Sequence, residues 1–191
     1  MKRNETATLL LDAAQALIQE RGYNAFSYKG LAASIGIRTA SIHYHFPAKG
    51  DLGVALMERY LEALEAELSR LDRSSKTVPS KLKSFIKLYN ETESRGAICL
   101  CGSLASDRET LPEPLQDVVS RYLDVSEQWV ARQISEGVSE GLFGYRGRAS
   151  EAATALISSL QGGLILSRAS SDGTPRVASV QRVFFKTLEA E

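Results

Sequence analysis

The amino-acid sequence predicts an all-α protein. Apolar residues recur at three- and four-residue steps in nearly every segment, whereas the alternation of apolar and polar residues that marks β-strands persists nowhere. Glycine and proline stand at the ends of these periodic segments, where helices stop and start. With 191 residues, of which 43% are apolar and 24% charged, the chain is long enough to bury a sizeable core.

Three helices are predicted in the N-terminal part, at residues 6–21, 27–35 and 39–45. Gly22 follows the first of them, at the position where a left-handed C-terminal cap is needed. Ser27 can cap the second helix, because its hydroxyl can accept a hydrogen bond from a backbone N–H of the first turn. Arg38 cannot cap the third helix in this way, so we expect Thr39 to take the cap or the helix to begin one residue later.

Longer amphipathic helices are predicted in the rest of the chain, joined by polar or glycine-rich turns. We expect them at residues 49–71, 79–95, 115–140, 149–167 and from 174 onward, with a short apolar segment at 99–106. A charged, serine-rich loop fills residues 72–78, and Leu-Pro-Glu-Pro at residues 111–114 breaks the chain before the helix that carries Trp129. A turn follows that helix at Gly141, Gly144 and Gly147.

The overall charge gives no reason to expect a nucleic-acid partner or a polybasic membrane-surface protein, because 23 basic residues balance 23 acidic ones. Residues 1–55 are the more basic part, with six Lys and Arg against four Asp and Glu. The longest apolar run, residues 97–101, is far shorter than the ~20 residues of a membrane span. The N-terminus lacks a secretory signal and two cysteines make no disulfide framework, so we expect a cytoplasmic protein with no membrane partner.

Residues 22–52 carry the pattern of a helix-turn-helix, in which two short helices meet at a sharp turn and the second enters the major groove of DNA. The turn is predicted at Ser34-Ile35-Gly36-Ile37, with the glycine at its sharp point. We expect a small core of Leu31, Ala32, Ile35, Ile37, Ile42 and Phe46. The outward face should then carry Thr39, Ala40, Ser41, His43 and Tyr44.

With Tyr44-His45-Phe46-Pro47 and the following Lys49 at the right offset, this segment strongly resembles the TetR family of bacterial transcriptional regulators. The resemblance covers about residues 6–56, and the family's plan of about nine helices fits the rest of the chain. It implies a DNA-binding domain at residues 1–48 and an effector-binding and dimerisation domain at 49–191. The implied function is that of a homodimeric regulator, a repressor that a small-molecule effector releases from a palindromic operator in double-stranded DNA.

The resemblance also implies which residues contact DNA. Ser27 and Lys49 match phosphate contacts at helix N-termini, and Tyr44 and His45 match phosphate or groove contacts. Two residues depart from the family pattern: Arg38 stands where a serine is usual, and His43 replaces the usual tyrosine. The full implied set is Ser27, Lys29, Arg38, Thr39, Ala40, Ser41, His43, Tyr44, His45 and Lys49.

Two further sets of residues follow for the C-terminal domain. The resemblance implies an effector pocket lined by Tyr60, Phe85, Tyr89, Leu100, Tyr122 and Trp129, although each is an ordinary core residue when taken singly. The small and apolar stripes of the last two helices should need a second copy of the chain to bury them, in a two-fold four-helix bundle. The predicted interface contains Leu156, Leu160, Gly163, Leu164, Val180 and Phe184.

Cys99 and Cys101 lie in a Cys-Leu-Cys-Gly-x-Leu-Ala stretch that resembles one C-terminal-domain subgroup of the family. Our preferred interpretation is that both are small buried core residues. The alternative is a sensor of oxidants or electrophiles, which requires a partly exposed thiolate; Arg95, four residues before Cys99, would share its helix face and could stabilise one.

Other classes of function are disfavoured. The sequence carries no Gly-x-Ser-x-Gly elbow, no Walker loop and no dinucleotide fingerprint, so we expect no enzymatic activity and no cofactor. His43 and His45 are two residues apart and would diverge on a helix, so we expect no metal site. A structural helical adaptor would bury the same apolar stripes without using the outward polar face of the third helix.

Overall fold

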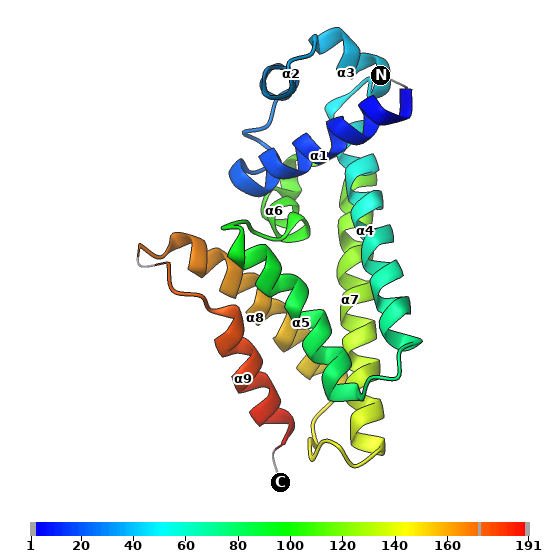
Figure 1. Cartoon of the computed structure of the whole chain (residues 1–191), viewed down its shortest axis with the longest axis vertical. Coiled ribbons are helices and arrows are strands. Elements are labelled where there is room, and N and C mark those ends of the chain that lie inside the picture. The colour runs from blue at the N-terminus through cyan, green and yellow to red at the C-terminus, as the bar shows by residue number, and fades with distance from the viewer. Residues whose placement is uncertain (1–2, 172, 190–191) are drawn as a thin grey trace. The chain divides into compact units, whose positions relative to one another are not determined.

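The computed structural model describes residues 3–171 and 173–189, and within these ranges every regular element is a helix. The predicted all-α class is therefore confirmed for the described residues. The helices, labelled in Figure 1, are α1 (Arg3–Arg21), α2 (Tyr28–Ile35), α3 (Thr39–His45), α4 (Lys49–Asp72), α5 (Val78–Ser94), α6 (Leu100–Ser106), the 3₁₀ turn η1 (Arg108–Thr110), α7 (Glu113–Ser139), α8 (Ala149–Ala169) and α9 (Val177–Leu188).

Several helices begin elsewhere than the sequence pattern predicts, and α1 begins at Arg3 instead of residue 6. Helix α7 begins at Glu113, so that Pro114 lies in its first turn, where the missing N–H of proline breaks no helical hydrogen bond. Helix α9 begins at Val177 and not at the Thr174-Pro175 pair. Its start is set by Glu93 of α5, because the Glu93 Oε1 atom accepts hydrogen bonds from the backbone N–H groups of Arg176, at 2.7 Å, and Val177, at 3.2 Å.

The chain forms two compact units. The first consists of the described residues up to Ala63 together with Leu100–Tyr122. In this unit α1 packs against α2 and α6, and α2 packs against α3 (Figure 1). Its core consists of fully buried apolar side chains, among them Leu10, Ile18, Leu31, Ile42, Leu52 and Leu56.

Two glycines on one face of α4 allow the start of α7 to lie close to it within the first unit. A Cβ atom at Gly50 would stand 2.9 Å from Cγ of Pro112, and one at Gly53 would stand 2.7 Å from Cδ2 of Leu115. Both separations are shorter than normal carbon contacts, so these positions favour glycine for reasons of space. Neither glycine has a left-handed backbone.

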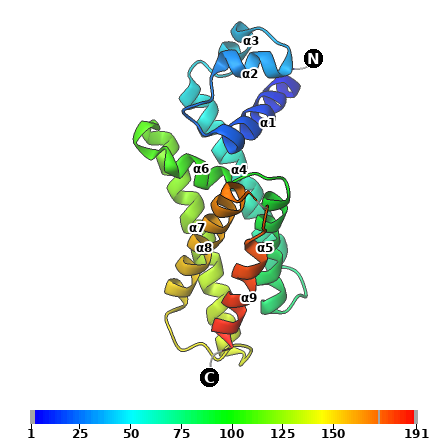
Figure 2. The ribbon, with the colours of Figure 1, turned by 90° about the vertical axis from the view of Figure 1, so that its left-hand side faces the viewer.

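The second unit consists of Leu64–Cys99 together with the described residues from Leu123 onward. Helices α5, α8 and α9 pack against one another in it, as Figure 2 shows. Leu82, Ile86, Val130, Ile134 and Leu160 are fully buried there. None of the helices in the described part of the chain has the length and the apolar character needed to cross a membrane.

Candidate nucleic-acid interface

The helix-turn-helix forms as the sequence predicts, with one difference at the start of α3. The Ser27 hydroxyl accepts the Gly30 N–H at 3.1 Å and caps α2, and Gly36 ends that helix with a left-handed backbone, φ +70°. Helix α3 begins at Thr39 although Arg38, in the N-cap position, makes no capping side-chain bond. The expected cap on Thr39 is therefore wrong, because the extended backbone of Arg38 alone is enough to start the helix.

The core of this motif is smaller than predicted. Leu31, Ala32 and Ile42 are buried, whereas Ile35, Ile37 and Phe46 keep part of their surface in solvent. A further anchor comes from Tyr28, whose buried hydroxyl lies 2.9 Å from the Phe46 carbonyl and 2.6 Å from the Ala48 carbonyl. This hydroxyl therefore fixes the turn between α3 and α4.

Tyr28 could have been identified from the sequence by its spacing, because residues 28, 31, 32 and 35 form one helical stripe. Burial, followed by the negative charge of Asp51 and the neighbouring Tyr23, raises the pKa of Tyr28 to about 12. The hydroxyl therefore stays protonated over the physiological range and donates to these carbonyls.

The outward face of α3 surrounds a shallow surface hollow of about 420 Å³. Tyr44 is the most exposed aromatic residue of this face, with 67% of its surface accessible, and its ring meets the His45 ring edge-on at 5.2 Å between centroids. The hollow is lined by Thr6, Arg38, Ala40, Ser41, Tyr44 and His45. Thr6 belongs to α1, and sequence reasoning missed it because α1 was given only a packing role.

Lys29 and Ser27 are exposed on the same unit, but Lys49 is turned inward. The Lys49 ammonium donates to the Tyr23 carbonyl at 2.7 Å and lies 4.1 Å from the centre of the Tyr23 ring. Partial burial lowers the pKa of Lys49, and the carboxylate of Asp107 partly opposes this shift. A phosphate contact by Lys49 thus requires the ammonium to leave, or to share, the Tyr23 carbonyl.

Asp107 holds the loop between α1 and α2. Its carboxylate accepts the backbone N–H groups of Tyr23, at 2.9 Å, and Asn24, at 3.3 Å, and the Asn24 side-chain amide at 2.9 Å. Asp51 plays a comparable part at the start of α4, where its carboxylate accepts the Ala48 N–H at 2.8 Å. The motif is therefore fastened at both ends by carboxylates.

The six residues predicted to line an effector pocket lie in two groups. In the first unit Tyr60 and Tyr122 stack with their ring centres 5.2 Å apart, and Leu100 is buried. In the second unit Phe85 stacks on Trp129 at 5.5 Å and lies 5.7 Å from Tyr89. The Phe85 and Trp129 rings are closely packed against each other.

The indole N–H of Trp129 has a partner within the chain. It donates to the Asp72 carboxylate at 2.9 Å, and the other oxygen of Asp72 accepts from Arg132 at 2.9 Å. An open groove of about 460 Å³ runs beside these residues, with Leu68 in its wall. The indole N–H of Trp129 is thus already engaged within the chain, and only 3% of the residue's surface is exposed.

Most of the residues predicted for the dimer interface are already buried within a single chain. Leu156, Leu160, Gly163, Leu164 and Phe184 are buried, and only Val180 is partly exposed. A Cβ at Gly163 would stand 3.7 Å from Val180, which shows how closely α8 and α9 approach. The premise that these residues need a second copy to bury them is therefore wrong, and the interface itself stays a prediction.

A second surface of the same helices remains uncovered. Val183 of α9 is 65% exposed, and it lines a groove of about 490 Å³ between α8 and α9. Small residues form much of the groove wall, with Ala155 and Ser159 on α8 and Ser179 and Thr187 on α9.

Both cysteines are buried, Cys99 with 3% and Cys101 with 0% of its surface exposed. The Cys101 sulfur lies 3.8 Å from the Val119 carbonyl, and the Arg95 guanidinium donates to the Thr92 hydroxyl. These facts support the interpretation of the cysteines as core residues.

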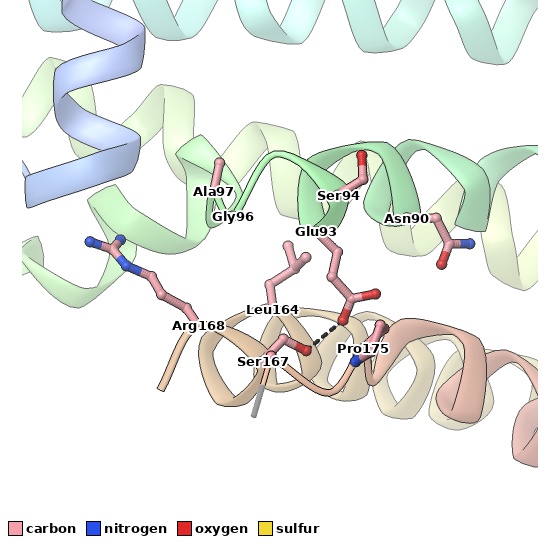
Figure 3. Close-up of a pocket in the computed structure, with 10 residues that line it drawn as sticks. Asn90, Glu93, Ser94, Gly96, Ala97, Leu164, Ser167, Arg168 and Pro175 are labelled. Atoms are coloured by element: carbon pink, nitrogen blue, oxygen red, sulfur yellow. Dashed lines mark hydrogen bonds between the residues drawn. The ribbon is translucent and has the colours of Figure 1, made fainter. Parts of the chain in front are cut away.

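A cavity of about 530 Å³ lies in the second unit between α5, the end of α8 and the segment that follows it. Figure 3 shows that Glu93 reaches across this region and accepts a hydrogen bond from the Ser167 hydroxyl. In the described part of the chain, no group of three or more His, Cys, Asp or Glu side chains could hold a metal ion.

Comparisons with known proteins agree with this geometry. The profile of the family "Bacterial regulatory proteins, tetR family" matches residues 10–56, which contain α2 and α3. A TetR transcriptional regulator from Legionella pneumophila is 33% identical over 94% of this chain and 95% of that chain, with a TM-score of 0.84. A TetR-family transcriptional regulator from Agrobacterium tumefaciens is 26% identical over 99% of this chain and 100% of that one, with a TM-score of 0.91.

Among curated proteins, the uncharacterized HTH-type transcriptional regulator YxaF of Bacillus subtilis is 27% identical over 95% of this chain and 94% of its own length. The fold, the helix-turn-helix and the similarity to these regulators over nearly the whole chain support the same family assignment. The chain therefore belongs to the TetR family of DNA-binding bacterial transcriptional regulators.

Proposed function

We propose that this protein is a homodimeric repressor that a small-molecule effector releases from a palindromic operator in double-stranded DNA. The observation that carries the proposal is the outward face of α3, where an exposed Tyr44 borders a shallow hollow together with Ser41 and His45. A structural adaptor would have no use for such a face, whereas a recognition helix needs side chains that reach base edges and phosphates.

We assign the DNA contacts by their chemistry. Ser27, Tyr44, His45 and Lys49 contact phosphates, and thereby position the protein without reading sequence. Thr39, Ser41 and the other outward residues of α3 read bases, as the resemblance to the family implies, and Ser41 lies in the wall of the hollow on this face. Lys29 and Arg38 add positive charge beside them.

The dimer is proposed on the uncovered groove between α8 and α9. A branched apolar residue such as Val183, largely exposed beside small residues, is typical of a surface that another helix covers. Two such surfaces, related by a two-fold axis, form a four-helix bundle, and this symmetry requires a palindromic operator.

The effector site is proposed at Phe85, Tyr89 and Trp129 of the second unit. The other residues of the predicted lining, Tyr60, Leu100 and Tyr122, lie in the first unit. A regulator from Saccharomonospora viridis with the same fold, 23% identical, has been solved in complex with choline. In functional terms we divide the chain at residue 48, with DNA binding before it and effector binding and dimerisation in 49–191. We also propose that the second part belongs to the subgroup whose C-terminal domain the Cys-Leu-Cys-Gly-x-Leu-Ala stretch resembles, and that the protein acts in the cytoplasm.

The test measures, by fluorescence anisotropy, how tightly the purified protein binds the DNA upstream of its own gene. Lys29→Ala should weaken binding, whereas Lys87→Ala, which removes another exposed lysine, from α5, should leave the affinity unchanged. Genomic footprinting then gives the operator, which should be palindromic. A protein that binds neither its upstream DNA nor any enriched genomic site would overturn the proposed function.

A further inference from the structure

The imidazole of His43 is fixed on two sides within the helix-turn-helix unit. Its Nδ1 atom lies 3.1 Å from the Pro47 carbonyl oxygen. Its ring meets the Tyr28 ring edge-on, with 4.9 Å between the ring centres and 69° between their planes. Tyr28 is itself anchored by its hydroxyl to the carbonyls of Phe46 and Ala48, so the turn that carries Pro47 is held in place.

The contact with Pro47 determines which ring nitrogen of His43 carries the proton. A carbonyl oxygen can only accept a hydrogen bond, so Nδ1 must carry the hydrogen. The neutral imidazole has a single N–H, which leaves Nε2 with a lone pair and no hydrogen. Within the described residues Nε2 makes no hydrogen bond, and the side chain is exposed.

His43 lies three and four residues after Ala40 and Thr39, and therefore shares their face of α3. Where the family usually has tyrosine, a phenol can donate or accept as the base requires. The neutral His43 ring has no such choice, because its one exposed nitrogen is an acceptor. The contact with Pro47 therefore makes His43 a hydrogen-bond acceptor towards DNA already in the free protein.

We propose that His43 is a specificity-determining residue whose Nε2 accepts a hydrogen bond from the exocyclic amino group of an adenine or a cytosine in the major groove. These two amino groups are the only hydrogen-bond donors that bases present there. Guanine offers the acceptors N7 and O6, and thymine offers O4 and a methyl group. Neither base can donate a hydrogen bond to the Nε2 lone pair of His43. This inference rests on the proposed function, because it requires α3 to read an operator.

The first experiment measures the tautomer in the full-length protein. Long-range proton–nitrogen NMR correlations at pH 8 distinguish a protonated ring nitrogen from an unprotonated one, and the chain has only two histidines. A His45→Gln variant assigns the signals. We expect a protonated Nδ1 and a bare Nε2 for His43. A protonated Nε2 in the neutral ring would overturn the inference.

The second experiment selects binding sites from random DNA at pH 8, where an ordinary histidine is neutral. The wild type should enrich adenine or cytosine at one position of each half-site, and His43→Phe, which keeps a ring against Tyr28, should lose the preference there alone. The matched control, His45→Phe, should weaken binding to all sites and keep that preference. Thermal melting checks that each variant is folded.

A base analogue then isolates the amino group. Replacing the selected adenine by purine, or the selected cytosine by its analogue without the 4-amino group, should weaken wild-type binding about three- to tenfold. The same replacement should not affect His43→Phe. Unchanged preferences in His43→Phe, or a preference of the wild type for guanine that depends on His43, would overturn this inference alone. A wild type that enriches no sequence would overturn the proposed function as well.

Discussion

In the first compact unit Tyr44, which is predicted to contact DNA, is 67% exposed. In the second unit Phe85 and Trp129, which are predicted to contact an effector, are 1% and 3% exposed. On the recognition helix α3 the side chains of His43 and Tyr44 are exposed, whereas Phe85 and Trp129 are already packed against each other. A DNA-binding face can therefore exist before its ligand arrives, but an effector site built from these rings requires them to move apart.

The largest effect is expected for a substitution in the buried core of the second unit. Leu160→Ala should lower the free energy of unfolding by about 2–5 kcal/mol, because it truncates a fully buried side chain of α8. Urea denaturation followed by circular dichroism measures it. A loss as small as that of an exposed residue, for which Lys87→Ala serves as control, would contradict the buried position of Leu160.

Val183→Glu separates the exposed part of the second unit from its core. Since Val183 is largely exposed, the variant should fold with little loss of stability but should sediment as a monomer at micromolar concentration. Operator affinity should fall about 100-fold or more, because the second half-site contact is lost. If the variant remains a dimer, the α8–α9 groove is not the interface.

Tyr28→Phe tests how much the Tyr28 hydroxyl contributes to stability through its bonds to the turn before α4. The folded-state pKa of Tyr28, about 12, lies above its usual value of 10.0, so its contribution to stability is complete below pH 10 and is lost as the pH rises towards 12. The free energy of unfolding should fall over this interval in the wild type and fall less in Tyr28→Phe. Equal slopes in the two proteins would show that Tyr28 titrates normally.

Lys49→Met and Thr39→Ala sharpen the assignment of the exposed face. The first should weaken binding to operator and random DNA by the same factor and reduce the salt dependence by about one ion, because it removes a phosphate contact. The second should change which bases are preferred. Anisotropy titrations at several salt concentrations measure both, and a base-specific effect of Lys49→Met would reverse its assigned role.

The smallest effect is expected at the cysteines. Because Cys99 and Cys101 are buried, peroxide should not release the wild type from DNA, and the Cys99→Ser, Cys101→Ser double variant should keep its response to an inducer. Release of the wild type by peroxide or quinone, together with a double variant that stays bound, would establish the thiol-sensing alternative.

These contrasts explain which parts of the protein the sequence could predict. The periodic pattern predicts the span of α3, residues 39–45, although not the residue in its N-cap position, because apolar spacing and turn glycines act over a few neighbouring residues. The start of α9 could not be predicted, since it depends on Glu93, which lies more than eighty residues earlier in the chain. Likewise the inward turn of Lys49 and the partner of the Trp129 indole depend on Tyr23 and Asp72, which are distant in sequence.

The close approach of Gly50 to Pro112 has a consequence for how related sequences vary. A side chain at residue 50 can be accommodated only if the ring of Pro112 is replaced or displaced, so the two positions should change together among homologues. Gly36, whose added Cβ would meet no atom within 4 Å, should vary independently of any partner and be limited only by its left-handed backbone. Covariation at 50 and 112 would thus record a steric fit that neither position shows on its own.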